Sequence, residues 1–149
     1  MKPIEGVVVD DCRRIDNDRG YLQEIWRDDR DGASPVRQIY TTCTREGVVK
    51  AWYKHAMQVD SFFVLEGEMR LVLVDDRPDA ASRGAMGEFL LSAREPRLLT
   101  LPPGIWHGFR SLSGNLVVLH ANSRPFRFEG PDELRLDPDS PGMPSWEQR

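Results

Sequence analysis

The apolar segments of this chain are short, because Gly, Pro, Asp or Ser separates them before any is long enough for an amphipathic helix. The segments are rich in β-branched, aromatic and aliphatic residues, which favours strands, and no window carries apolar residues at helical spacing. Many short strands in succession are typical of an all-β sandwich or barrel. The strands expected from this pattern are Gly6–Asp10, Tyr21–Trp26, Val36–Cys43, Val48–Tyr53, Ser61–Leu65, Met69–Val74, Glu88–Leu91, Arg97–Leu101, Trp106–Phe109 and Asn115–Ala121.

A length of 149 residues suits one domain. We expect its core over about residues 16–124 and a C-terminal arm over about residues 125–149. The arm is rich in Pro, yet it keeps large apolar residues that favour packing over disorder. Within the core, Glu66-Gly67 between two apolar runs predicts a tight hairpin, because Gly readily adopts positive φ.

Composition excludes several classes of function. Lys and Arg number 20 against 24 Asp and Glu, so the net charge is −4, whereas a nucleic-acid or anionic-membrane partner needs a dense basic surface. The longest apolar runs are about four residues, far short of the roughly twenty that a membrane helix needs. The N-terminal residues also lack the apolar core of a secretory signal, which predicts a cytoplasmic protein. Cys12 and Cys43 form no CxxC pair and are expected to be reduced thiols.

Two of the three histidines lie in spaced motifs. The first motif runs from Gly47 through Tyr53-Lys54-His55 and Asp60 to Gly67, and the second is Pro102-Pro103-Gly104-Ile105-Trp106-His107. Their spacing resembles the two cupin motifs, G-x5-H-x-H-x3,4-E-x6-G and P-x-G-x2-H. Tyr53 stands where the first motif has its first His, and Asp60 stands where it has Glu. The resemblance implies a cupin jelly-roll barrel.

Alternation along the strands would bring the ionisable residues of these motifs into one pocket. Residues i and i+2 of a strand share a face, so Ala51, Tyr53 and His55 are expected to point the same way. Asp60 and His107 are expected to face them from neighbouring strands. A pocket that is half apolar and half ionisable perturbs pKa values and is a candidate active site.

Segments on both sides of these motifs resemble the dTDP-4-dehydrorhamnose 3,5-epimerases. Arg19-Gly20-Tyr21-Leu22-Gln23-Glu24 resembles R-G-x-F-x-E of that family, and Gly47–Tyr53 resembles G-V-L-R-G-L-H. Pro103–Phe109 is similar to P-x-G-x-A-H-G-F, and the run from Pro131 to Trp146 is similar to the family's C-terminal segment. The resemblance implies a metal-free, homodimeric cupin that acts on a nucleotide-linked 4-keto-6-deoxy sugar in polysaccharide or deoxy-sugar biosynthesis.

In that family a His removes a proton next to the ketone, a Lys steadies the enolate and a Tyr returns a proton to the opposite face. Here the His position is Tyr53, the Lys position is Asp60, and the region of the Tyr reads Arg124-Pro125-Phe126-Arg127. We therefore expect a rebuilt catalytic site. His55 would be the base, Asp60 would orient it, and Tyr53 would be the acid. His107 would supply a hydrogen bond or a second proton carrier.

Substrate contacts are expected at five further positions. The resemblance implies that Arg19 and Lys50 contact the phosphates of the ligand, which suits their positive charge. Glu24 and Gln38 match family positions and are expected to contact the substrate. His120 lies on the apolar face of its strand and is expected in the pocket wall.

Two alternatives stay open. His55, Asp60 and His107 form a 2-His-1-carboxylate set at cupin spacing, which suits Fe(II), Mn(II) or Zn(II) in a metal-dependent cupin enzyme. The second alternative is a cupin that binds sugar nucleotides without turnover, which the loss of the family's base, Lys and acid would explain.

Overall fold

The computed structural model describes residues 3–147, and strands joined by turns and loops make up all of this range. The same residues include no helix long and apolar enough to cross a membrane. The all-β prediction is therefore confirmed. The strands are β1 (Val8–Asp11), β2 (Arg14–Asn17), β3 (Gly20–Gln23), β4 (Gln38–Thr44), β5 (Val49–Lys54), β6 (Asp60–Asp75), β7 (Met86–Ser92), β8 (Arg97–Leu101), β9 (Ile105–Asn122) and β10 (Leu134–Arg135).

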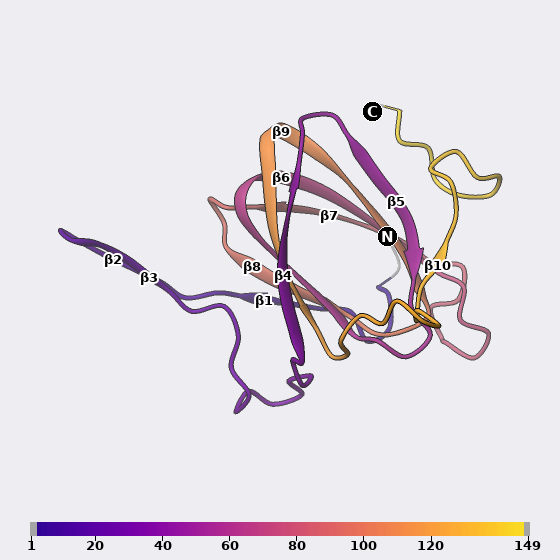
Figure 1. The fold of residues 1–149 in the computed structure, drawn as a ribbon, viewed down its shortest axis with the longest axis horizontal. Helices are drawn as coiled ribbons and strands as arrows, with labels where there is room; N and C mark the ends of the chain where they lie inside the picture. Colours follow the sequence, from indigo (N-terminus) through magenta and orange to yellow (C-terminus); the bar gives the residue numbers. More distant parts are fainter. Residues whose placement is uncertain (1–2, 148–149) are drawn as a thin grey trace.

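Two long strands, β6 and β9, run through both layers of the barrel (Figure 1). They pair antiparallel along their whole length, from Asp60 opposite Asn122 to Asp75 opposite Ile105. In one layer, the first half of β6 also pairs with β8, and β8 pairs with β1. The second half of β9 pairs with β4 in the same layer. In the other layer, the second half of β6 pairs with β7. The first half of β9 pairs there with β5, and β5 also pairs with β10. The result is the expected jelly-roll barrel.

Apolar side chains from both layers fill the barrel. Phe62, Leu71, Leu99 and Leu116 are all buried in this main core. A second cluster lies outside it, where Trp146 packs against Trp52 with their ring centroids 4.9 Å apart. The C-terminal segment therefore packs on the barrel through Trp146, whereas Phe126, Phe128, Leu134 and Leu136, which were also expected to pack, are exposed.

The hairpin expected at Glu66-Gly67 is wrong, because both residues lie inside the continuous strand β6. Register shifts on either side of Glu66 mark a bulge. An extra residue reverses the alternation, so Phe62 and Val64 enter the core before the bulge, and Met69 enters it after the bulge. The two short strands expected on either side of Glu66-Gly67 are therefore one, and Trp106–Phe109 and Asn115–Ala121 likewise merge into β9.

A second bulge lies in β5 between Lys50 and Tyr53. Ala51 and Trp52 both belong to the outer cluster around Trp146. Lys50 and Tyr53 instead line a cavity inside the barrel. The expectation that Ala51 shares the inner face with Tyr53 is therefore wrong, because the bulge shifts the alternation by one residue.

A separate hairpin of β2 and β3 projects away from the barrel (Figure 1). Tyr21 and Leu22 on this hairpin each expose 61% of their surface. The strand expected at Tyr21–Trp26 ends at Gln23, and its partner β2 was not expected. β1, which pairs with β8, lies before the boundary expected at residue 16.

Gly67 is expected to be essential for the bend in β6. Its φ is +85°, and a Cβ there would lie 2.7 Å from the carbonyl oxygen of Asn115. Gly142 has a φ of +84° with no atom near its Cβ position, so Gly142→Ala measures the cost of the φ angle alone. We expect Gly142→Ala to lower the free energy of unfolding by about 1–2 kcal/mol and Gly67→Ala by about 3 kcal/mol or more. Denaturant unfolding measures both, and equal losses would contradict the role of the bulge.

Candidate active site

Inward-facing side chains of four strands line a cavity of about 270 Å³ inside the barrel. All four residues expected to be catalytic line it, as do Lys50 and His120. The complete lining is Tyr40, Thr42, Lys50, Tyr53, His55, Asp60, Phe62, His107, Phe109, His120 and Glu133.

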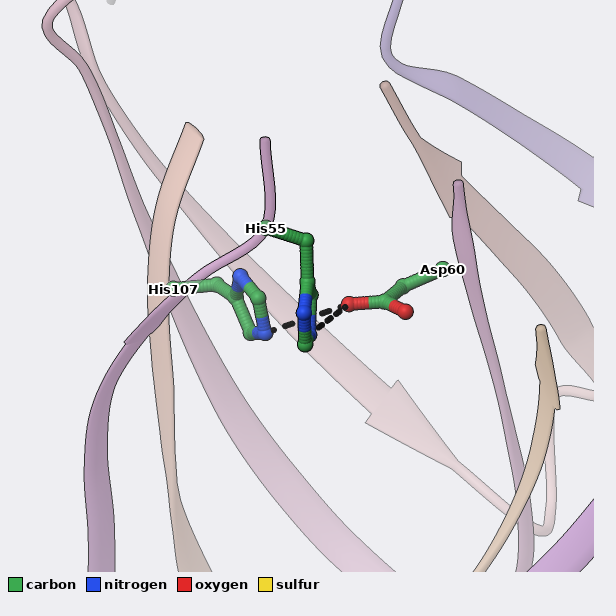
Figure 2. Close-up of side chains that lie close together, drawn as sticks. All are labelled: His55, Asp60 and His107. Carbon is green, nitrogen blue, oxygen red and sulfur yellow. Dashed lines mark ion pairs between the residues drawn. The ribbon is translucent and has the colours of Figure 1, made fainter. Parts of the chain in front are cut away.

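One carboxylate oxygen of Asp60 faces both His55 and His107 in a cluster largely shielded from solvent (Figure 2). Its Oδ2 is 3.1 Å from Nε2 of His55 and 3.3 Å from Nε2 of His107. Gln58 donates a hydrogen bond from Nε2 to the other carboxylate oxygen at 2.6 Å. Burial acts to raise the pKa of Asp60, but the hydrogen bonds from His55 and Gln58 and the positive charge of His55 lower it below its usual value. Asp60 is therefore an ionised carboxylate that presents one oxygen to two imidazole rings.

Backbone carbonyls fix the orientation of both rings. His55 donates from Nδ1 to the carbonyl oxygen of Asp132, and His107 donates from Nδ1 to that of Ile105 at 3.1 Å. A carbonyl oxygen only accepts, so each Nδ1 carries a hydrogen. Both Nε2 atoms therefore face Asp60, and a histidine needs a second proton to donate to the carboxylate.

The two histidines differ in their affinity for that proton. Burial acts to lower the pKa of His55, but the hydrogen bond and charge of Asp60 outweigh it and raise the pKa to about 9. Burial lowers the pKa of His107 below the usual histidine value, and Asp60 offsets this only in part. At neutral pH His55 is protonated and His107 is neutral. Environments that separate two pKa values in this way provide one acid and one base.

A second ring pair lies on β4 and the far half of β9. His120 stacks on Tyr40 with ring centroids 4.6 Å apart, and its Nε2 is 2.9 Å from Oγ1 of Thr42. Burial lowers the pKa of His120 to about 4, so this ring is neutral at physiological pH. Stacked flat rings beside a hydroxyl form a wall that suits contact with a sugar ring. His120 thus lies in the pocket wall, as the sequence predicts.

The C-terminal arm completes the site, a role that sequence reasoning did not assign to it. The carboxylate of Asp132 accepts the backbone N–H groups of Ala56, Met57 and Gln58 at 2.8, 3.0 and 2.9 Å. The carbonyl of the same residue holds the His55 ring. Asp132 therefore fixes both the turn after β5 and the imidazole that precedes it.

An outer cavity of about 380 Å³ adjoins the inner one, because Tyr40, His55 and Glu133 line both. It contains several donors that could bind an anion. Sequence reasoning identified only Gln38; Arg37 directly precedes it, and Arg124 and Arg127 come from a separate segment that the fold brings beside it. These donors are Arg37, Gln38, Arg124 and Arg127.

Two residues expected to contact substrate lie outside both cavities. Arg19 is exposed at the tip of the β2–β3 hairpin. Glu24 follows β3 and pairs with Arg27 at 3.0 Å. Neither residue contacts the cavity of its own chain.

The donor set around Asp60 also fits a divalent transition metal. His55, Asp60 and His107 each offer one ligand atom, and these atoms lie within 4.8 Å of one another. Two imidazoles and one carboxylate are a set that Fe(II), Mn(II) and Zn(II) accept. Each ring also donates its other N–H to a backbone carbonyl, as metal-binding histidines commonly do.

Comparisons with known proteins identify the family of the chain. A relative in Bacillus subtilis, the spore coat polysaccharide biosynthesis protein SpsL, is 31% identical over 134 residues, or 89% of each chain. The probable low-salt glycan biosynthesis epimerase Agl13 of Haloferax volcanii is 29% identical over 142 residues, or 93% of this chain and 91% of that protein. The crystal structure of a dTDP sugar isomerase from Desulfovibrio desulfuricans superposes with a TM-score of 0.86 at 27% identity, covering 93% of this chain and 88% of that one. The family model of dTDP-4-dehydrorhamnose 3,5-epimerase matches residues 1–144, so the chain belongs to this family of sugar epimerases.

Proposed function

We propose that the protein moves a proton at a carbon next to the ketone of a nucleotide-linked 4-keto-6-deoxy sugar, as a step in glycan or polysaccharide biosynthesis. The observation that carries this proposal is the pair of histidines whose Nε2 atoms lie 3.1 and 3.3 Å from the buried carboxylate of Asp60 inside a cavity, where their surroundings raise the pKa of His55 and lower that of His107. Removal and return of a carbon-bound proton require such a base and acid. Membership of the epimerase family supports the class of substrate.

The separated pKa values assign the roles. His107 is neutral at pH 7 and accepts the proton, whereas His55 carries the proton that Asp60 stabilises. This reverses the role of base that the sequence suggests for His55. Tyr53 lies opposite His107 on the paired strands, with ring centroids 6.2 Å apart, and can donate as a second acid.

The two cavities bind different parts of the substrate in this proposal. The sugar occupies the inner cavity, beside the histidines, and the diphosphate occupies the outer one. The outer cavity suits phosphate because the planar guanidinium groups of Arg37, Arg124 and Arg127 can each bind it in a bidentate manner. Gln38 lies among them and adds a hydrogen-bonding side chain.

We also propose a homodimer, in which the β2–β3 hairpin packs on a second copy. A projecting hairpin with exposed Tyr21 and Leu22 gains burial only against another surface. Such packing would carry Arg19 and Glu24 away from their own barrel and toward a partner's cavity. The cytoplasmic location stays a prediction.

Proton exchange in D2O tests the reaction. We expect dTDP-4-keto-6-deoxyglucose to gain deuterium at C3, C5 or both faster than without protein, as read by NMR. The rate should fall as the pH rises through about 9, because His55 then loses its proton, and fall in acid as His107 becomes protonated. Failure to exchange would contradict the proposed reaction, and retained dTDP binding would then indicate a binding protein. A rate that keeps rising through pH 9 would instead identify His55 as the base.

A metal-dependent reaction at the same site is the second candidate, favoured by the convergence of three ligand atoms. A bound divalent metal would polarise the ketone. We propose that the enzyme is metal-free. The purified protein should therefore hold well under one equivalent of Fe, Mn or Zn by elemental analysis, and dialysis against a chelator should leave its exchange rate unchanged. One equivalent of metal together with loss of exchange on chelation would contradict the metal-free mechanism.

A further inference from the structure

The proposed reaction leaves a negative charge on the ketone oxygen, and this charge needs a cation. The family's Lys position is occupied by Asp60, whose own charge would repel an enolate. We propose that Lys50 takes over this task, holding the ketone oxygen and stabilising the enolate. The role of Lys50 rests on the proposed function, and it differs from the phosphate contact that the resemblance implies.

The bulge in β5 is what places Lys50 in the cavity. In a regular strand Lys50 and Lys54 would share a face, opposite that of Tyr53. Because Ala51 and Trp52 both pack outward, Lys50 and Tyr53 both line the inner cavity. Lys54 keeps the outer position, where it pairs with Asp76 at 2.7 Å.

The strand register sets Lys50 close to the proton-transfer groups. Lys50 lies opposite Phe109, and Tyr53 lies opposite His107 on the same strand β9. Phe109 and His107 are two residues apart, which is roughly 7 Å along a strand. A sugar ring beside His107 can therefore present its ketone oxygen to the ammonium group of Lys50.

Among the residues that the structure describes, Lys50 has no carboxylate partner. Across the described range 3–147, Lys50 forms no ion pair and donates no side-chain hydrogen bond. Burial is the main cause of the low pKa of His120, and the positive charge of Lys50 adds to it, which agrees with an ammonium group near the cavity wall. A cation without a carboxylate partner in a partly buried cavity is suited to stabilising a developing oxyanion.

Lys50 lines the inner cavity and not the outer one, where the arginines lie. Its removal should therefore affect the reaction more than the binding of the nucleotide. In the step itself, Nε2 of His107 takes the proton from the carbon next to the ketone. The electron pair of that C–H bond forms a C=C bond, and the carbonyl π pair moves to the oxygen held by Lys50. Return of a proton to carbon from His55 or Tyr53 restores the ketone.

Two measurements on Lys50→Met separate its possible roles, with Lys54→Met as the matched control on the outer face. We expect Lys50→Met to lower the deuterium-exchange rate at saturating substrate by about 10²–10³-fold. Its Kd for dTDP, which has no ketone, should stay within about threefold of the wild-type value by calorimetry. Lys50→Arg should recover part of the rate, because it restores the charge. Lys54→Met should exchange at close to the wild-type rate.

These measurements distinguish failure of the role of Lys50 from failure of the proposed function. Exchange by Lys50→Met at the wild-type rate would overturn the role of Lys50, and so would a raised Kd for dTDP with an unchanged rate at saturation, which indicates a phosphate contact. Absence of exchange in the wild-type protein would contradict the proposed function, and the role of Lys50 would fall with it. Circular dichroism checks folding, and Lys50→Gln replaces Lys50→Met if the latter fails to fold.

Discussion

The contact of two imidazole rings with the buried carboxylate of Asp60 is the interaction on which the rest of the site depends. An ionised carboxylate at 4% exposure is costly unless protons and hydrogen bonds compensate for it. His55 and Gln58 donate the hydrogen bonds that provide this compensation, and His107 lies 3.3 Å from the same carboxylate oxygen as His55. Three different parts of the fold must meet to form this cluster: the start of β6, the start of β9 and the turn that Asp132 of the C-terminal arm holds. The long paired strands and the packed arm are thus as much a part of the site as the side chains.

Sequence reasoning found the parts of this structure that local patterns determine. Strand composition predicts the all-β fold, and motif spacing predicts that His55, Asp60 and His107 meet. Sequence reasoning did not predict the two bulges, which depend on pairing with strands distant in the sequence. Gly67 could form a turn or a bulge with the same φ, and only the approach of Asn115 to its Cβ position distinguishes them. The inward position of Lys50 likewise depends on a bulge against β9, and no strand-alternation rule predicts it.

The contacts of the C-terminal arm likewise could not be predicted from its sequence. Its Pro-rich composition and large apolar residues predict packing, and Trp146 does pack on Trp52. The same composition carries no information on which loop the arm would reach. Asp132 acts at residues 56–58 because it lies just before β10, which adds to β5. Arg124, just before the arm, lines the outer cavity because it follows the end of β9. Functional residues from such a segment can be recognised from the structure but not from spacing.

The motif resemblance indicates that the charged side chains of this site occupy different positions from those of its family. A carboxylate occupies the family's Lys position, and a lysine that alternation would turn outward lies inside the cavity. In the proposed mechanism, the proton-transfer role moves from the position of Tyr53 to the two histidines that contact Asp60. Deuterium exchange into a 4-keto sugar nucleotide by Asp60→Asn tests this arrangement most directly, because Asn keeps the shape of the side chain and removes its charge. The proton on His55 should then be lost, exchange should fall by about 100-fold or more, and dTDP should still bind. Exchange by Asp60→Asn at the wild-type rate would contradict the central role of the carboxylate.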